Sequence, residues 1–191
     1  MPQPKHVIAL DLEMPGKLEP DLQKYFDKCE EKIGFVPNVI RAYAAKPARW
    51  RAFVAMYHAL MDDEQSALTK LECEMIAVVV SCVNRCYYCL VAHGAAVRGL
   101  SGDPELGEML VMNYRNAELS KRQRAMLDYA WKVTETPWLI EEPDRQALRD
   151  AGFDDSGIFD ISEIAAFYNM TNRMAYGTHM MPNPEYHKLD R

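Results

Sequence analysis

Residues 74–99 read EMIAVVVSCVNRCYYCLVAHGAAVRG, an apolar run that holds one glutamate, three cysteines and one histidine. Nearly every residue in the range 75–83 is apolar, which predicts a helix that is buried on almost all sides. Thr69 and Glu72 stand just before this run in the order of a capping box, in which each side chain satisfies a free amide of the first turn. The sequence therefore predicts a buried helix that begins next to Thr69.

The apolar run is interrupted at Asn84 and Arg85. Asparagine is a favoured N-cap residue, and the arginine places a charge where the preceding helix should stop. An unbroken helix would hold Glu74 about 18 Å along its axis from Cys86, which is too far for contact. We therefore expect a sharp turn at this interruption, after which the second helix packs against the first and the Glu74 carboxylate approaches His93.

Cys86 and Cys89 form a CxxC pair at the start of the second helix, where their Cα atoms should lie about 5 Å apart, within the range of a disulfide. Free amides and the positive end of the helix dipole favour a thiolate there. His93 follows Cys89 by four residues and should share its helix face, so its imidazole can take the thiol proton. With Glu74 to orient the imidazole, the set has the logic of a catalytic triad with a sulfur nucleophile.

A thiolate of this kind attacks a peroxide oxygen, releases an alcohol or water and becomes a sulfenic acid. A neighbouring thiol then condenses with the sulfenic acid to form a disulfide. An external dithiol must reduce that disulfide by exchange before the next turnover. The residue pattern therefore indicates thiol-based reduction of peroxides.

The order of these residues resembles the E-x11-CxxC-x3-H signature of the alkylhydroperoxidase D proteins, in the carboxymuconolactone decarboxylase superfamily. Glu74 stands at its start, CYYC in its middle and His93 at its end. The wider stretch resembles the branch labelled peroxidase-related. The resemblance is specific around residues 66–100 and looser across about 35–180. It implies an all-α helical bundle that self-associates into dimers, trimers or hexamers and reduces organic hydroperoxides.

The resemblance also implies a role for each site residue. Cys89 would be the peroxidatic cysteine, Cys86 would resolve it and meet the reductant, and Glu74 and His93 would relay protons. In the best-known members a further histidine stands just before the second cysteine, where this chain has Tyr88. This departure bears on the proton relay and on the lipoylated-protein reductant that those members use. Plain decarboxylases of the superfamily lack the CxxC pair.

Glycine, proline and apolar spacing predict helices along the rest of the chain, with at most a short strand at HVIAL (6–10). The predicted helices cover residues 18–32, 37–45, 47 onward, the segment after the capping pair Ser120 and Gln123, and 161–176. LTKLECEMIA (68–77) and LSKRQRAMLD (119–128) are similar, which suggests two related helical halves, of which only the first carries the sulfur chemistry. We expect residues 1–191 to form one domain.

Composition and charge narrow the class of protein. Hydrophobic residues make up 49% and charged residues 26% of the 191, as in ordinary globular proteins. The net charge of −6 and the absence of a Lys/Arg cluster argue against nucleic-acid and membrane-surface partners. The first residues lack the pattern of a secretion signal, and the apolar run is shorter than the roughly 20 residues that span a bilayer. Five cysteines, an odd number, indicate reactive sulfur in a reducing compartment, so we expect a cytoplasmic protein.

Two metal sites compete with this interpretation. Cys82 and the CxxC pair together have the CxxxCxxC spacing of radical-SAM iron–sulfur enzymes, but those enzymes need a β/α barrel, and the chain shows no alternation of strands and helices. Zinc could bind the cysteines and His93, but structural zinc sites usually use two separated ligand pairs, and one is visible. We expect no metal and no other cofactor. The remaining alternatives are a thiol–disulfide partner or redox sensor without peroxide turnover, and a metal-binding or purely structural helical oligomer.

The other cysteines and histidines have simpler interpretations. Cys29, Cys73 and Cys82 lie in helical segments, where buried cysteine often behaves as a small hydrophobe. His58, His179 and His187 are interpreted as packed or exposed residues without a catalytic role. The sequence thus predicts four site residues, namely Glu74, Cys86, Cys89 and His93, with a hydroperoxide as substrate and an external dithiol as electron donor.

Overall fold

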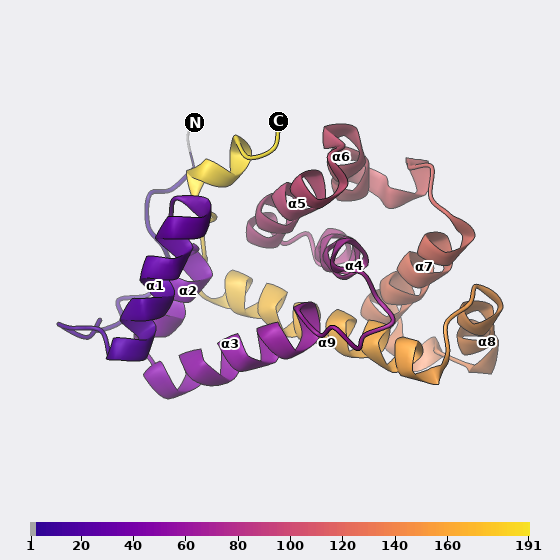
Figure 1. The fold of residues 1–191 in the computed structure, drawn as a ribbon, viewed down its shortest axis with the longest axis horizontal. Coiled ribbons are helices and arrows are strands. Elements are labelled where there is room, and N and C mark those ends of the chain that lie inside the picture. The colour runs from indigo at the N-terminus through magenta and orange to yellow at the C-terminus, as the bar shows by residue number, and fades with distance from the viewer. Residues whose placement is uncertain (1–2) are drawn as a thin grey trace.

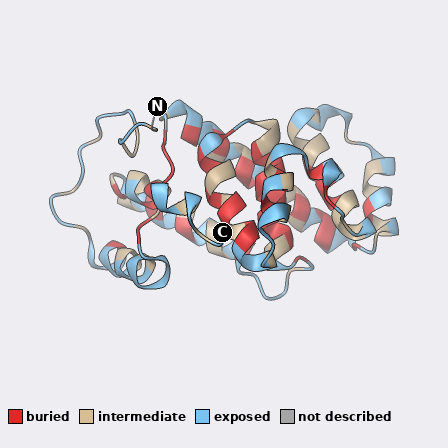
Figure 2. Cartoon of the chain, turned by 90° about the horizontal axis from the view of Figure 1, so that it is seen from above, coloured by how far each residue is buried: buried red, intermediate tan, exposed pale blue. Residues whose placement is uncertain are grey.

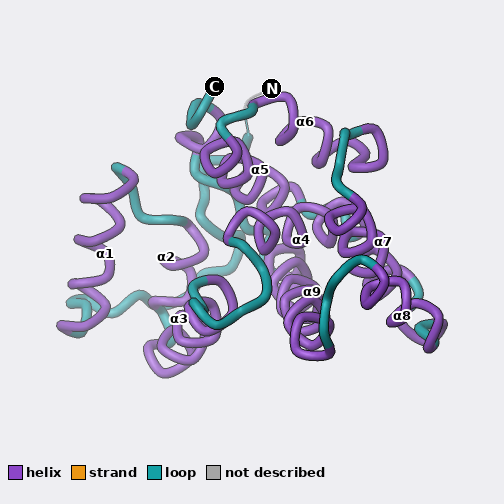
Figure 3. The backbone as a smooth tube through the Cα atoms, turned by 45° about the vertical axis from the view of Figure 1, so that its right-hand side comes forward, coloured by secondary structure: helices purple, strands orange, loops and turns teal. Residues whose placement is uncertain are grey.

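The structure is a computed structural model that describes residues 3–191 and folds them into nine α-helices without a strand (Figures 1 and 3). The helices are α1 (Pro20–Ile33), α2 (Asn38–Ala44), α3 (Pro47–Met61), α4 (Lys70–Val83), α5 (Tyr87–Ser101), α6 (Pro104–Asn113), α7 (Lys121–Glu135), α8 (Glu142–Asp150) and α9 (Asp155–Gly177). Three short 3-10 helices cover Tyr114–Asn116, Pro137–Leu139 and Pro184–His187. The prediction of an all-α fold is confirmed.

Helix α4 is the centre of the main core. Residues 72–81 are all buried, and α4 packs against α5, α6, α7 and α9. In Figure 1 it lies in the middle of the helices, and Figure 2 shows the buried residues gathered in this region. The predicted capping box is present: the Thr69 hydroxyl accepts from the Glu72 amide at 3.2 Å, and the Glu72 carboxylate accepts from the Thr69 amide at 2.9 Å. An apolar helix capped in this way can be enclosed without unpaired amides in its first turn.

The chain turns sharply between α4 and α5, as the sequence predicts. Arg85 has a left-handed backbone with φ of 56°. Its amide donates to the Cys82 carbonyl at 3.0 Å, and the Cys86 amide donates to the Ser81 carbonyl at 2.9 Å. This pair of bonds is a Schellman motif, which satisfies the last carbonyls of α4 and directs the chain away. Helix α5 then packs against α4.

One detail of the turn differs from the prediction. Asn84 is the C-cap of α4, and Cys86 takes the N-cap position of α5. The reason is the left-handed residue, which places the Schellman turn between the asparagine and the second helix. The Asn84 amide group instead donates to two side chains of α9, those of Asn169 at 3.0 Å and Asn172 at 2.9 Å. The asparagine therefore fastens the turn to α9.

Helices α1, α2 and α3 lie at one end of the molecule around a second apolar cluster (Figure 1). Its buried members are Leu22, Val36, Ile40, Ala44, Trp50 and Val54. Helix α1 ends at Gly34, whose φ of 79° is left-handed, and α2 and α3 begin at the predicted prolines. The predicted helices in this region are confirmed.

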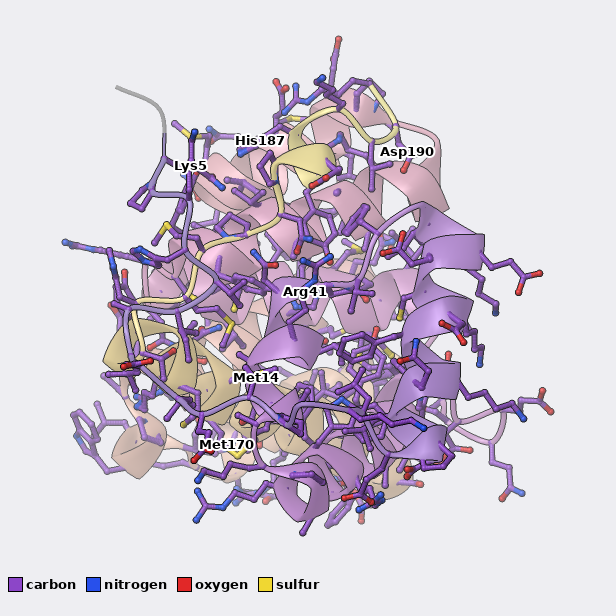
Figure 4. The ribbon with its side chains drawn as sticks, turned by 90° about the vertical axis from the view of Figure 1, so that its left-hand side faces the viewer. Lys5, Met14, Arg41, Met170, His187 and Asp190 are labelled. Atoms are coloured by element: carbon purple, nitrogen blue, oxygen red, sulfur yellow. The ribbon has the colours of Figure 1, made fainter. Side chains whose placement is uncertain are left out.

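The two ends of the chain run together across the same end of the molecule. The Ala9 amide donates to the Thr178 carbonyl at 2.9 Å, and the Met181 amide donates to the Val7 carbonyl at 3.0 Å. Residues 6–10 form no strand despite these bonds. Figure 4 shows this end, with Lys5 on one segment and His187 on the other.

The second half of the chain also follows the predicted pattern. Ser120 and Gln123 form the capping box at the start of α7, and α7 packs against both α4 and α9. Helix α9 begins at Asp155, six residues before the predicted start, because the Asp154 carboxylate accepts from the Gly157 amide at 2.8 Å. The relationship between the two halves stays a prediction. None of the described helices combines the length and apolar character that crossing a membrane requires.

Candidate active site

The two cysteines of the CxxC pair lie at the start of α5. Cys86 is its N-cap residue and Cys89 lies in its first turn, with exposed fractions of 2% and 3%. Both thiols are free, so no disulfide links the pair. They belong to a third apolar cluster in which α5, α9 and the C-terminal tail meet. Both sulfurs are therefore shielded from bulk water.

The surroundings of the two thiols shift their pKa values in opposite directions. The pKa of Cys86 lies below the ordinary value because the Cys89 thiol donates a hydrogen bond to its sulfur, and the amides of Tyr88 and Cys89 at the helix N-terminus also face it. The positive charge of His93 lowers the pKa of Cys86 further. The pKa of Cys89 lies well above its ordinary value, because its proton is held in that hydrogen bond and its sulfur is buried. Of the two thiols, Cys86 is therefore the one that ionises first.

This difference leads to a titration prediction. Because the two thiols share a hydrogen bond, they should lose their protons in two separated steps, the first below the ordinary pKa of about 9. In Cys86→Ser and in Cys89→Ser the remaining thiol should titrate in one step, with a midpoint between the two midpoints of the wild-type pair. Ultraviolet thiolate absorbance as a function of pH measures both cases. Equal midpoints for the wild type and both variants would contradict the coupling.

Glu74 and His93 meet as the sequence predicts. Helix α5 folds back on α4, and the His93 Nδ1 atom lies 2.6 Å from the Glu74 Oε2 atom. The carboxylate is buried, and the imidazole ring packs edge-on against Tyr168, with 4.7 Å between ring centroids. A carboxylate on Nδ1 holds the proton on that nitrogen and leaves Nε2 to exchange protons with a substrate. The pair is a buried acid–base unit at the side of the thiols.

A pocket of about 150 Å³ borders both the imidazole and one sulfur. Cys89 and His93 line it, whereas Cys86 is not among the described residues of its wall. Helices α1, α2, α3, α5 and α9 and the C-terminal tail contribute the wall. Figure 4 views the molecule from the side of α2, on which Arg41 is labelled. Its aromatic members are Tyr25, Tyr43, Phe53, Tyr57, Tyr88, Phe167, Tyr168 and Tyr186. The pocket therefore suits an apolar or aromatic compound.

A predicted direct contact is not formed. No hydrogen bond joins the His93 ring to either sulfur within residues 3–191, although Cys89 and His93 border the same pocket. Removal of the Cys89 proton by the imidazole thus stays a prediction. Both groups line the pocket and therefore face any compound bound there.

Tyr88 occupies the position at which the best-known alkylhydroperoxidase D proteins carry a histidine. Its hydroxyl accepts a hydrogen bond from the Val39 amide of α2 at 3.0 Å, and Tyr186 of the tail lines the same pocket. Burial raises the pKa of Tyr88 well above its ordinary value, so the phenol stays neutral. This residue ties α5 to α2 and to the tail, and closes one side of the pocket.

Comparison with known proteins places the chain in a family. A model of the carboxymuconolactone decarboxylase family matches residues 47–114. A peroxidase-related protein from Silicibacter sp. TM1040 is 59% identical over 100% of both chains, with a TM-score of 0.96. The chain belongs to the alkylhydroperoxidase D-like branch of the carboxymuconolactone decarboxylase superfamily.

Two further solved structures resemble this alkylhydroperoxidase D-like chain. A peroxidase-related protein with an AhpD core, from Ralstonia eutropha JMP134, is 39% identical over 98% of both chains, with a TM-score of 0.93. The C82A variant of the debrominase Bmp8 in complex with 2,3,4-tribromopyrrole is 17% identical, covers 95% of this chain and 96% of its own, and has a TM-score of 0.79. The latter likeness shows the fold alone. No curated protein sequence matches the chain.

The remaining cysteines of this alkylhydroperoxidase D-like protein all have a raised pKa. Burial raises the pKa of Cys73 and of Cys82 to about 12, and the Cys82 thiol donates to the Val111 carbonyl at 2.9 Å. Cys29 lines the pocket from α1, and burial raises its pKa as well. The structural interpretation of Cys73 and Cys82 is supported by these contacts.

The described residues give little support to either of the two metal-site alternatives. Residues 3–191 contain no strand, so this part of the molecule has no β/α barrel of the kind that the iron–sulfur alternative requires. Among these residues no three His, Cys, Asp or Glu side chains gather in a way that could hold a metal ion.

Several residues of the site were not predicted. Ser81 and Asn172 are fully buried, and the Asn172 carboxamide donates to the Ser81 hydroxyl oxygen at 3.1 Å. Tyr168 supports the imidazole, and the wall contributed by α1 to α3 is distant in sequence from the motif. A polar residue inside an apolar helix was the signal available for Ser81 and Asn172. No local pattern marks the pocket wall.

Proposed function

We propose that this protein is a thiol-dependent peroxidase that reduces organic hydroperoxides. The observation that supports it best is a free CxxC thiol pair of which one residue, Cys89, borders a pocket together with a carboxylate-bound imidazole. The 59% identical relative is itself described as peroxidase-related. Cys89 attacks, Cys86 resolves, and Glu74 and His93 move protons.

The first half of the reaction breaks the O–O bond. The proton shared by the two sulfurs moves to Cys86, and the Cys89 thiolate attacks the terminal oxygen of the hydroperoxide. A bond forms between sulfur and oxygen, the sulfur is oxidised to a sulfenic acid, and the organic oxygen leaves with the electron pair. The protonated His93 imidazole donates its Nε2 proton to this oxygen, so that an alcohol is released. Glu74 stabilises the positive charge of the imidazole before the transfer.

The second half forms the disulfide. The Cys86 sulfur attacks the Cys89 sulfenic acid, the S–O bond breaks, and the hydroxide combines with the Cys86 proton to leave as water. The peroxide has then gained two electrons and the thiol pair has lost two. An external dithiol exchanges with the disulfide, returning one proton to Cys89 and one to His93. Because both sulfurs are buried, the reductant must reach them through the pocket or after the C-terminal tail moves away.

The proposal predicts a disulfide between residues 86 and 89 after one equivalent of an apolar hydroperoxide such as cumene hydroperoxide. Peptide mass spectrometry should find this link, and steady-state consumption should continue with dithiothreitol present. The Cys82→Ala variant is the matched control, because this cysteine lies one turn before the corner and its thiol bonds only to carbonyls. It should retain both properties.

Other outcomes of the same experiment favour the rival functions. A disulfide that forms once but sustains no turnover with dithiol would favour a redox sensor or thiol–disulfide partner. Thiols that stay unmodified by the peroxide would favour a structural role. Either result would overturn the proposed peroxidase.

A second candidate is the reductive removal of bromine from a small aromatic compound. The debrominase with this fold binds a brominated pyrrole, and the aromatic wall of the present pocket suits such a ring. The electrons balance: the thiol pair becomes a disulfide, bromide leaves, and the ring carbon gains a proton. Bromide release from 2,3,4-tribromopyrrole with dithiothreitol, absent in Cys89→Ser, tests this candidate. No bromide release would exclude it and leave the peroxidase proposal unaffected.

A further inference from the structure

A buried carboxamide lies behind the two sulfurs. Asn172 of α9 is fully buried, in a helix segment whose inner face is otherwise apolar. The thiol of Cys86 points toward its backbone carbonyl at a long 4.0 Å, and hydrogen bonding by its side chain lowers the pKa of Cys89. One residue of a distant helix therefore acts on both members of the thiol pair.

Hydrogen bonds fix the orientation of the Asn172 carboxamide. Its Oδ1 atom accepts from the Asn84 side chain at 2.9 Å, and its Nδ2 atom donates to the Ser81 hydroxyl oxygen at 3.1 Å. The Asn84 group donates in turn to Asn169, whose own amide donates to Thr134. If the Asn172 carboxamide were reversed, its NH2 group would face the NH2 group of Asn84, and neither could accept a hydrogen bond. These hydrogen bonds therefore allow only one orientation of the carboxamide.

One donor of the carboxamide remains after these bonds are counted. An asparagine NH2 group carries two hydrogens, and Ser81 takes one of them. The hydroxyl hydrogen of Ser81 is itself used, because it donates to the Ala77 carbonyl at 2.7 Å. Ser81 therefore cannot donate to the Cys89 sulfur at the same time. The second hydrogen of the Asn172 Nδ2 atom is the available donor beside that sulfur.

A buried sulfur that acquires negative charge needs such a donor. Cys89 has an exposed fraction of 3%, so water does not solvate it freely. We propose that Asn172 is a catalytic residue of this site, whose fixed N–H donates to the Cys89 sulfur when the thiolate forms and so stabilises the attacking form. The inference rests on the proposed function for its role in turnover, whereas the contact itself can be tested without any peroxide.

The turn between α4 and α5 has a second role in this hydrogen-bond network. Asn84 ends α4 and also holds the oxygen of the Asn172 carboxamide. The turn that brings the site together thereby also orients the donor. Because the donor is fixed before the reaction begins, no reorganisation is needed when the charge moves from Cys86 to Cys89.

The test uses the full chain with Cys86→Ser, in which Cys89 is the only thiol of the pair. Adding Asn172→Leu, which has a similar branched shape and no donor, should raise the midpoint of Cys89 ionisation by about one to two pH units. Adding Asn172→Ala should raise it less, because water can enter the space. The other titratable groups near Cys89, which are His93, Tyr88 and Tyr168, are unchanged in all these proteins. Ultraviolet thiolate absorbance reports the midpoint, and circular dichroism reports folding.

Thr134→Val is the matched control. It removes a hydroxyl at the far end of the same network, where Thr134 accepts from Asn169 and donates to the Ala130 carbonyl, without touching a sulfur. In the Cys86→Ser background it should leave the Cys89 midpoint unchanged. An equal shift in the control, or no shift in either folded Asn172 variant, would overturn the assignment.

Kinetics separate this inference from the proposed function. With both cysteines present, Asn172→Leu should slow the reaction of the reduced protein with cumene hydroperoxide by about tenfold to a hundredfold at neutral pH. If the wild type shows no peroxide turnover, the proposed function fails while the titration still decides the contact. If the wild type turns over and Asn172→Leu reacts at the same rate, the role of Asn172 in turnover fails by itself.

Discussion

Cys89→Ser should lose at least about a thousandfold in peroxide turnover, because it removes the only sulfur of the pair that borders the pocket. A serine hydroxyl is a far weaker nucleophile at neutral pH, and no base in contact would compensate for it. Steady-state consumption of cumene hydroperoxide with dithiothreitol measures the loss. The stability should change little, because serine and cysteine have similar shapes in this partly polar environment.

Cys86→Ser is the informative partner of that variant. It keeps the attacking sulfur and removes the resolving one, so a sulfenic acid should accumulate on Cys89 after one equivalent of hydroperoxide. A dimedone label found on residue 89 by mass spectrometry would support the assigned roles. A label on residue 86 of the Cys89→Ser protein would reverse them. That reversal has a physical basis, because the pKa of Cys86 is the lower of the two.

Glu74→Gln and His93→Gln should each lower kcat/KM by about a hundredfold to ten-thousandfold, the usual contribution of general acid–base catalysis. Glutamine in place of Glu74 keeps the hydrogen bond to the imidazole but cannot stabilise its positive charge. Glutamine in place of His93 removes the proton donor altogether. Kinetics with an organic hydroperoxide, at saturating dithiol, measure both effects.

The double variant tests whether the two residues act together. If Glu74 acts through His93, the double variant should be about as slow as His93→Gln alone. Additive losses would contradict the relay. His93→Gln should also be the less stable single variant, because it leaves a buried carboxylate without its partner, which typically costs about 3 kcal/mol. Both variants should remain folded, and thermal unfolding of each checks this.

Much of the fold could be predicted because its signals are local. The capping box at Thr69 and Glu72, the prolines before α2 and α3, and the glycine after α1 each act on the backbone of neighbouring residues. The turn at Asn84 and Arg85 was also predicted, although its motif was misassigned. A left-handed arginine is uncommon, so the residue types suggested an N-cap where the structure has a Schellman motif.

The candidate site was only partly predictable. Spacing on one helix placed Cys86 and Cys89 in contact, and the turn placed Glu74 beside His93. The position of the charge within the thiol pair depends on amides and burial that no spacing reveals. The pocket wall and Asn172 come from segments far from the motif in sequence.

The sequence by itself determined which helices form, where the chain turns, and which acid, imidazole and thiols share that corner, because periodicity, caps and spacing are properties of neighbouring residues. Only the tertiary structure decided which sulfur carries the charge, which one faces the pocket, and which amide supports it. The physical reason is that burial, long-range hydrogen bonds and cavity shape arise where α1 to α3, α9 and the tail close over α5. These are sums over contacts between segments, and no single segment contains them.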